Sequence, residues 1–237
     1  LEFRKDIYRL GRFCLTRGTL KGIDVYVART GYTGEPIGYE IYVHPHKAPE
    51  LWHALLEEGK QHGIEPAGLG ARDSTRTEAG LPLYGHELAG PFDVSPLEAG
   101  YGFAVRLHKP YFIGRDVMLE QERNLKKTLV RCRATRKATR MLSTGDPVLD
   151  RNGKVVGNVT SSVVVDGYQI VIAYVNARSN KKGNNVYCYP LGAIRKKEKL
   201  VSELGMGDRS IVPVELEVIA RFMRKKEDFP IIINWNA

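Results

Sequence analysis

Two carboxylates, Glu35 and Glu40, lie in the glycine-rich stretch Arg29–Glu40 ("RTGYTGEPIGYE"), between two runs of alternating apolar residues. A plain hairpin connection needs only about two to five residues. If the second strand begins near Gly38, Glu40 points to the same face as Tyr42, and Glu35 stays in the turn. We interpret Glu35 as a turn residue that accepts backbone N–H bonds. Glu40 is then a strand carboxylate that faces either solvent or a ligand, and periodicity leaves these alternatives open.

Two arginines stand out in the segment Ala67–Leu88, "AGLGARDSTRTEAGLPLYGHEL". Arg72 and Arg76 are four residues apart, so they share a face of the helix expected here. A cation near a helix start opposes the helix dipole unless it helps to hold an anion. Arginine can bind a carboxylate in bidentate fashion. The alternative is a surface ion pair of Arg72 with Asp73 or Glu78.

Other reactive patterns are missing from the sequence. It has no P-loop, no dinucleotide-binding GxGxxG after a strand, no GxSxG nucleophile elbow and no HExxH. The cysteines Cys14, Cys132 and Cys188 form no CxxC pair, and we interpret them as reduced, mostly buried thiols. We therefore expect no metal site and no covalent catalyst. No apolar run reaches about 18 residues, so we expect no membrane span.

The pattern of apolar residues predicts the elements that position these side chains. Alternation predicts strands at residues 23–28 and 39–43. Helices are predicted over 49–62, with Leu51, Trp52, Leu55 and Leu56 on one face, and over 68–79 and 114–122. From about Lys126 the chain consists of strand-like runs separated by turns, which is typical of a sandwich or barrel. Residues 192–210 resemble a polar excursion between two strands.

Charge changes sign along the chain. Residues 1–122 hold 14 Lys/Arg and 17 Asp/Glu, a net charge of −3, whereas residues 123–237 hold 22 and 10, a net charge of +12. We place a domain boundary near residues 122–126. The run 123–140 has eight basic residues and no acidic one. Such a field attracts anions, but the run has no interleaved aromatics and no nucleic-acid-binding signature, so nucleic acid is disfavoured. The alternative is a solvated edge strand.

Five motifs occur in an order and spacing that resemble one family. They are "ARTGYTGE", "GLGARD", "EAGLPLYGHEL", "SPLEAGYGFAV" and "FIGRD", and "GDPVLDRNGKVVGNVTSS" followed by "IVIAYV" extends the match to about residue 176. Together they resemble the aminomethyltransferases, the T-proteins of the glycine cleavage system. Farther along, the match is poor apart from "VPVELEVIARF". The resemblance implies an α+β fold: part of a folate-binding domain with an antiparallel sheet and helices in residues 1–122, and an all-β barrel in residues 123–237.

The resemblance also implies a function. The family transfers a one-carbon unit from the aminomethyl-lipoyl arm of the H-protein to tetrahydrofolate and releases ammonia. By motif, Tyr32, Glu40 and Arg72 match folate-contacting residues, with Arg76 and Tyr84 as possible secondary contacts. It implies tetrahydrofolate as the cofactor, the acidic, lipoylated H-protein as a partner, possible oligomers, and a place in the cytoplasm, or the mitochondrial matrix in a eukaryote.

Two departures from the family pattern bear on this interpretation. The family loop is usually "GYTGEDGFE", whereas this chain has "GYTGEPIGYE", with one more residue and a proline. A folate-dependent demethylase or methyltransferase of the same fold is therefore an alternative, and a non-catalytic folate-binding scaffold is another. The family's catalytic aspartate lies in an N-terminal region without a counterpart here. We expect a fragment with no catalytic residue of its own, inactive in isolation.

Overall fold

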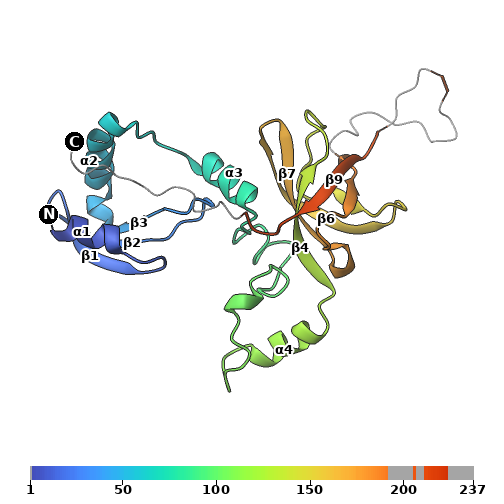
Figure 1. The fold of residues 1–237 in the computed structure, drawn as a ribbon, viewed down its shortest axis with the longest axis horizontal. Coiled ribbons are helices and arrows are strands. Elements are labelled where there is room, and N and C mark those ends of the chain that lie inside the picture. Colours follow the sequence, from blue (N-terminus) through green and yellow to red (C-terminus); the bar gives the residue numbers. More distant parts are fainter. Residues whose placement is uncertain (1, 192–204, 207–210, 224–237) are drawn as a thin grey trace. The chain divides into compact units, whose positions relative to one another are not determined.

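The computed structural model describes residues 2–191, 205–206 and 211–223, and the side chains from residue 6 onward. Packing divides the chain into two compact units (Figure 1). The first includes residues up to Thr75, and the second runs from Arg76 to Met223. Of the predicted polar excursion at residues 192–210, most lies outside the described residues. The two units are described separately below.

The first unit contains a three-stranded antiparallel sheet in the order β1-β2-β3. Its strands are β1 (Leu15–Leu20), β2 (Ile23–Ala28) and β3 (Glu40–Val43). Ile23, Val25 and Val27 alternate along β2, and all three are buried in one cluster with Leu51. The predicted strand periodicity is confirmed, because one face of the sheet packs into this core while the other remains polar.

Three α-helices begin in this unit. They are α1 (Glu2–Arg9), α2 (Ala48–Gly59), which continues as a 3₁₀ turn at Lys60–His62, and α3 (Leu69–Ala79). The predicted helices at 49–62 and 68–79 are confirmed. Leu51 is buried as expected, but the side chain of Trp52 is 49% exposed, so its assignment to the core-facing stripe is wrong. Trp52 directly follows Leu51, and a rotation of about 100° per residue turns it away from the sheet.

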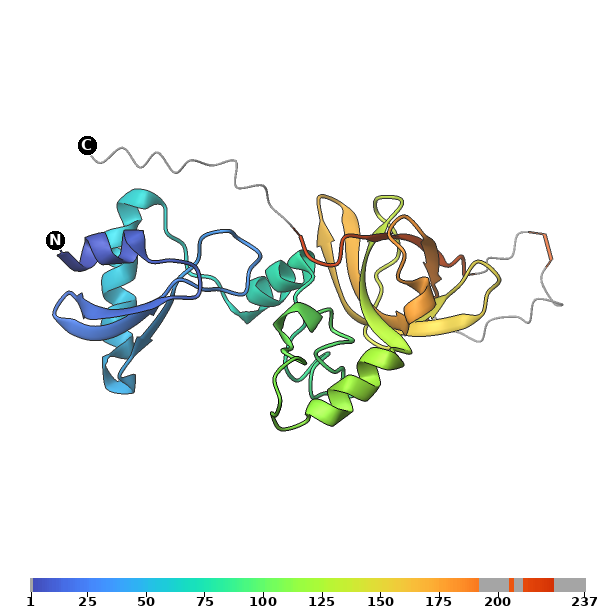
Figure 2. The same ribbon diagram turned by 60° about the horizontal axis from the view of Figure 1, so that its bottom comes forward.

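The second unit is built on a closed barrel (Figure 2). Its strands follow the order β4-β7-β6-β5-β8-β9. The strands are β4 (Lys127–Ala134), β5 (Pro147–Leu149), β6 (Val155–Val165), β7 (Tyr168–Asn176), β8 (Asn185–Cys188) and β9 (Val214–Ile219). Its interior is filled mainly by valine, leucine and alanine side chains. The predicted all-β barrel is confirmed, including a final strand within the "VPVELEVIA" run.

The alternative of a solvated edge strand for the basic run is wrong. Strand β4 pairs with β7 on one side and with β9 on the other, because a closed barrel has no edges. Its cations lie partly against aromatic rings of β7. The guanidinium carbon of Arg133 is 4.0 Å from the ring centre of Tyr168, and the Lys127 ammonium is 5.2 Å from that of Tyr174. Burial lowers the pKa of Arg131, which is buried in the same strand.

Residues between α3 and the barrel pack with the barrel. The Leu129 N–H donates to the Glu98 carbonyl at 2.8 Å, and the Tyr174 hydroxyl donates to the Glu98 carboxylate at 2.6 Å. Helix α4 (Arg115–Arg123), predicted at 114–122, leads directly into β4. Packing therefore groups residues 76–122 with the strands that follow, although charge and composition change only near residues 122–126. The domain boundary drawn there from the sequence stays a prediction.

Three simple findings complete the description of the fold. Within the described residues, no helix is long and apolar enough to cross a membrane. In the same residues, no group of three or more His, Cys, Asp or Glu side chains could hold a metal ion. All three cysteines are free; Cys132 and Cys188 are buried, and burial raises the pKa of each thiol to about 12, whereas Cys14 is exposed.

Candidate functional site

The loop between β2 and β3 positions Glu40 at the start of a strand. Arg29 ties the loop's first end to the segment before β1, because its Nη1 donates to the Leu10 carbonyl at 3.0 Å. At the neck of the loop, a Cβ on Gly38 would lie 3.2 Å from the Thr30 carbonyl oxygen, so the two chain segments pass closely there. Glu40 then pairs with Ala28 as the first residue of β3, so the prediction that Glu40 is a strand residue is confirmed.

The carboxylate of Glu40 lies on the polar face of the sheet. Its Oε2 accepts a hydrogen bond of 3.1 Å from the Tyr42 hydroxyl, which confirms that the two side chains share a face. This is the one hydrogen bond of the Glu40 side chain within the described residues. Because a carboxylate offers about four acceptor positions, most of them remain available. The hydrogen bond to Glu40, together with the charge of Glu40, raises the pKa of Tyr42.

Aromatic side chains extend this face beyond Glu40. Tyr26 of β2 lies directly opposite Tyr42 of β3, and their side chains are 45% and 54% exposed. The Arg17 guanidinium carbon lies 5.8 Å from the ring centre of Tyr26. The face therefore combines acceptors at Glu40 with two accessible phenol rings. Such a surface can accept adjacent N–H donors of a flat heterocycle and contact the ring.

The other residues predicted in the first unit occupy different elements. Tyr32 is half-buried in the β2–β3 loop. Arg72 lies near the start of α3, where its side chain is exposed and its N–H donates to the Gly68 carbonyl at 3.2 Å. Glu35 is exposed, and its own N–H donates to Thr33 Oγ1 at 3.4 Å.

Arg76 has quite different surroundings from Arg72. In the second unit it is fully buried and forms an ion pair with the equally buried Glu87, with Nη1 3.1 Å from Oε2. Its Nη2 also donates to the hydroxyl of Ser161 on β6 at 2.9 Å. The shared helix face predicted for Arg72 and Arg76 thus does not give them a common role. A buried guanidinium held on several sides acts in folding, and this placement does not support a ligand contact by Arg76.

A bulge in β6 completes the surroundings of Glu87. Successive side chains of a strand normally point to opposite faces, yet the hydroxyls of Thr160 and Ser161 both lie near Glu87 Oε1, at 2.8 and 2.6 Å. The β6–β7 register shifts between Val159 and Ser161, which allows this. Burial by itself raises the pKa of Glu87. Hydrogen bonds from the Leu83 N–H and Ser161, with the charge of Arg76, outweigh burial and leave the pKa below its ordinary value.

Glu87 in turn holds the loop that carries Tyr84. Its Oε2 accepts the Leu83 N–H at 2.9 Å, and its own N–H donates to the Leu83 carbonyl at 3.1 Å. The side chain of Tyr84 itself is 78% exposed. Hydrogen bonds between Leu83 and the buried Glu87 therefore fix the loop, and its Tyr84 ring is exposed to solvent.

Several of these residues were not identified from the sequence. The role of Glu87 depends on Ser161, which is 74 residues away, so no local pattern reveals it. Tyr26 and Tyr42 could have been found, because each occupies the outward position in a strand of period two. A basic groove on the barrel, described below, was missed because its residues come from three separate segments.

The fold first defines a class of protein. It has an α+β unit, whose antiparallel sheet has one polar face, and a second unit built on a six-stranded barrel. Comparison with known proteins then identifies the family. Residues 8–109 match the model of the GCVT N-terminal domain. A solved structure, the glycine cleavage system aminomethyltransferase T from Bartonella henselae, superposes with a TM-score of 0.69 at 27% identity, over 90% of this chain. These matches support the aminomethyltransferase family, which the motifs predicted.

Curated relatives agree with this result. An aminomethyltransferase of Alkaliphilus metalliredigens is 41% identical over 81% of this chain, and one of Caldanaerobacter subterraneus is 54% identical over 47% of it. These alignments cover 51% and 29% of the two relatives, and the superposition covers 52% of the Bartonella protein. Some relatives match most of this chain, and the chain spans about half the length of those relatives.

Proposed function

We propose that this chain contributes the folate-binding part of a tetrahydrofolate-dependent aminomethyltransferase of the glycine cleavage system. In the reaction, a lipoyl-S–CH₂–NH₂ group and two N–H groups of tetrahydrofolate give an N–CH₂–N bridge, a free lipoyl thiol and ammonia. The carbon–sulfur and carbon–nitrogen bonds of the donor break, and two carbon–nitrogen bonds to folate form. The two folate protons leave with the thiol and the ammonia.

One observation carries this proposal more than any other. Glu40 is a half-buried strand carboxylate with unused acceptor positions, beside the exposed ring of Tyr42. A solvent-facing strand position more often carries Thr or a β-branched residue, and a carboxylate there suits a ligand with adjacent N–H donors. The heterocycle of tetrahydrofolate has such donors. Glu40 also stands where the motif of the family has its folate-contacting glutamate.

Other residues complete the proposed contacts. Tyr32 packs beside the folate ring, and Arg72 meets carbonyl or carboxylate oxygens of the ligand, for which its exposed guanidinium is free to reorient. Tyr84 is exposed but belongs to the second unit, so it is not included among these contacts of the first unit. Arg76 is left out, because its donors are engaged inside the second unit.

The complete reaction needs more than these residues. A carboxylate that orients the reacting folate nitrogen has no counterpart by motif in this chain, so we expect binding without turnover from these 237 residues alone. The donor in this proposal is a lipoylated H-protein, an acidic partner suited to the excess of basic residues after residue 122. The proposed place of the reaction is the cytoplasm.

Calorimetric titration of the full chain with tetrahydrofolate tests the site. We expect Glu40→Ala and Arg72→Ala each to weaken binding by about ten-fold or more, because each removes a charge-assisted hydrogen bond. Glu35→Ala is the matched control, since it removes a carboxylate from the same loop, and its affinity should stay unchanged. Equal affinity in all three variants and the wild type would refute the assignment.

The altered loop favours a second candidate. Pro36 and Ile37 lengthen the connection next to Glu40, and Ile37 is 38% exposed, so it can shape the space around a donor. A folate-dependent demethylase of the same fold would use a methyl donor in place of the aminomethyl-lipoyl arm. Folate-linked turnover by the whole enzyme with methylamine donors, but not with aminomethyl-H-protein, would decide for this alternative.

A further inference from the structure

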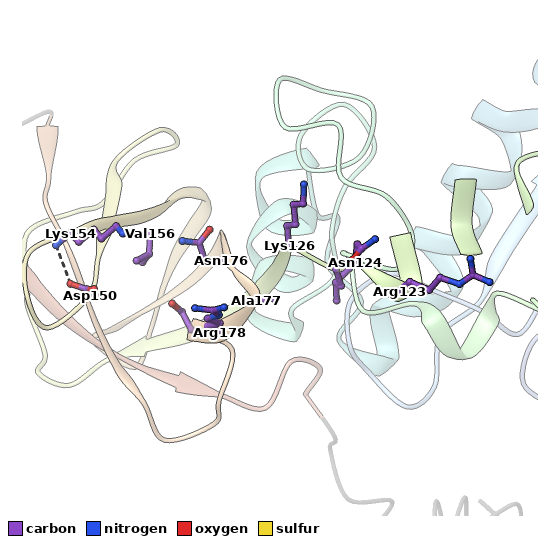
Figure 3. A pocket seen from close by; sticks show the side chains of 11 residues that line it. Arg123, Asn124, Lys126, Asp150, Lys154, Val156, Asn176, Ala177 and Arg178 are labelled. Carbon is purple, nitrogen blue, oxygen red and sulfur yellow. Dashed lines mark hydrogen bonds between the residues drawn. The ribbon is translucent and has the colours of Figure 1, made fainter. Parts of the chain in front are cut away.

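A basic groove lies on the second unit, where three chain segments meet. It has a volume of about 640 Å³, and four cations line it: Arg123, Lys126, Lys154 and Arg178 (Figure 3). Arg123 ends α4, Lys126 precedes β4, Lys154 is the last residue of the β5–β6 connection, and Arg178 lies in the 3₁₀ turn Ala177–Ser179 after β7. The fold thus gathers charges that are far apart in the sequence.

The side chains of these four cations have no ion-pair partner among the residues that the structure describes. All four are exposed to solvent. Asp150, a carboxylate that also lines the groove, accepts hydrogen bonds from the backbone of its own β5–β6 connection. Its Oδ1 accepts the N–H groups of Asn152 and Lys154 at 2.8 and 3.0 Å. Asp150 therefore fixes the turn that carries Lys154 and only partly offsets the positive charge.

Like charges in one concave surface repel each other, and low-dielectric walls strengthen their field. A bound anion relieves this repulsion and receives charge-assisted hydrogen bonds from several directions. We infer that this groove is a binding site for a small multivalent oxyanion, a ligand with two or more phosphate or carboxylate groups. None of its lining residues is among the proposed folate contacts, so this inference does not depend on the proposed folate site.

The shape and lining of the groove favour a small ligand over a nucleic acid. Its volume lies within the range of about 300–1,000 Å³ typical of small-molecule sites. Among the described residues, no aromatic side chain lines it, so these residues offer bases nothing on which to stack. Asn176 adds an amide donor to the lining, whereas the side-chain amide of Asn124, which also lines the groove, donates to the Glu120 carboxylate at 2.7 Å. The site therefore matches charged oxygens and offers little to a base.

Titration of the full chain with tripolyphosphate, and separately with citrate, tests this inference and distinguishes the phosphate and carboxylate forms of the ligand. We expect binding of at least one probe, weakened by about ten-fold in Lys154→Gln and again in Arg178→Gln. The matched control is Lys182→Gln, which removes one exposed positive charge outside the groove and should bind as the wild type does.

Three results would overturn the inference. The first is that neither probe binds. The second is that all three variants lose affinity equally, which would indicate only the general field of a basic barrel. The third is that a short RNA binds with the same dependence on Lys154 and Arg178 while both small probes fail to bind. Thermal unfolding of each variant shows whether a loss of binding comes from misfolding. Because it relieves repulsion, Lys154→Gln should unfold at the same temperature as the wild type or higher, and at one probe concentration it should gain less stability than the wild type and Lys182→Gln do.

Discussion

Two carboxylates, Glu40 in the first unit and Glu87 in the second, show how similar side chains serve different ends. Glu87 is fully buried, and its two oxygens are occupied by Arg76, the Leu83 N–H and the hydroxyls of Thr160 and Ser161. Glu40 is half-buried and accepts one hydrogen bond, from a neighbour on its own strand. A carboxylate with all its acceptors satisfied by the fold stabilises the fold. One with unused acceptors is available to a ligand.

The arginines four residues apart on α3 repeat this contrast. Arg76 is locked by Glu87 and Ser161, whereas Arg72, one turn earlier, is exposed. The helix is continuous through both, so the difference comes from what each side chain meets and not from local structure. The comparison predicts that substitutions of Arg76 and Glu87 lower stability, whereas substitutions of Arg72 and Glu40 weaken ligand binding.

The largest expected effect is on folding. Arg76→Ala should lower the free energy of unfolding by about 3–5 kcal/mol, because it leaves Glu87 buried without its counter-ion. Arg72→Ala is the matched control on the same helix and should change stability by no more than about 0.5 kcal/mol. Urea denaturation followed by circular dichroism measures both. Similar losses in the two variants would show that the burial of Arg76 does not matter to stability.

Acid should reveal the same buried pair. The pKa of Glu87 is lower in the folded protein than in the unfolded chain, so its charged form stabilises the folded state above the unfolded pKa. That contribution is lost as pH falls through the lower, folded pKa. We expect the wild type to lose stability more steeply below about pH 4.5 than the Glu87→Gln variant, which has no charge to lose. Parallel pH profiles from thermal unfolding would contradict this.

Sequence patterns predicted the parts of this molecule that are set locally. The strand of Ile23, Val25 and Val27, the helix ending before Gly80 and most of the barrel strands follow from periodicity and turn residues. Local periodicity also put Glu40 in a strand with Tyr42 on its face. These features depend on neighbours a few residues away, which a pattern records.

Long-range packing set the features that sequence patterns missed. The bulge at Thr160 lets two adjacent hydroxyls reach Glu87, and nothing in "NVTSS" indicates a bulge. The same limit explains Arg76, whose partners on β6 and in the 83–87 loop are invisible to helix spacing. It also explains why the alternative of an edge strand for the basic run is wrong, since barrel closure pairs β4 on both sides.

The smallest expected effect lies on the open face and tests whether Glu40 is as accessible as the comparison requires. Its hydrogen bond and charge raise the pKa of Tyr42 above the ordinary 10.0. In Glu40→Gln the charge is gone, so the pKa of Tyr42 should return toward that value while stability changes little. Tyrosine ring carbons followed by NMR against pH report the shift, and the exposed Tyr26 is an internal reference. If bound tetrahydrofolate takes the acceptors of Glu40, the ligand should change the Tyr42 titration as well. If the Tyr42 titration responds to the substitution but not to the ligand, Glu40 contacts Tyr42 but does not contact tetrahydrofolate.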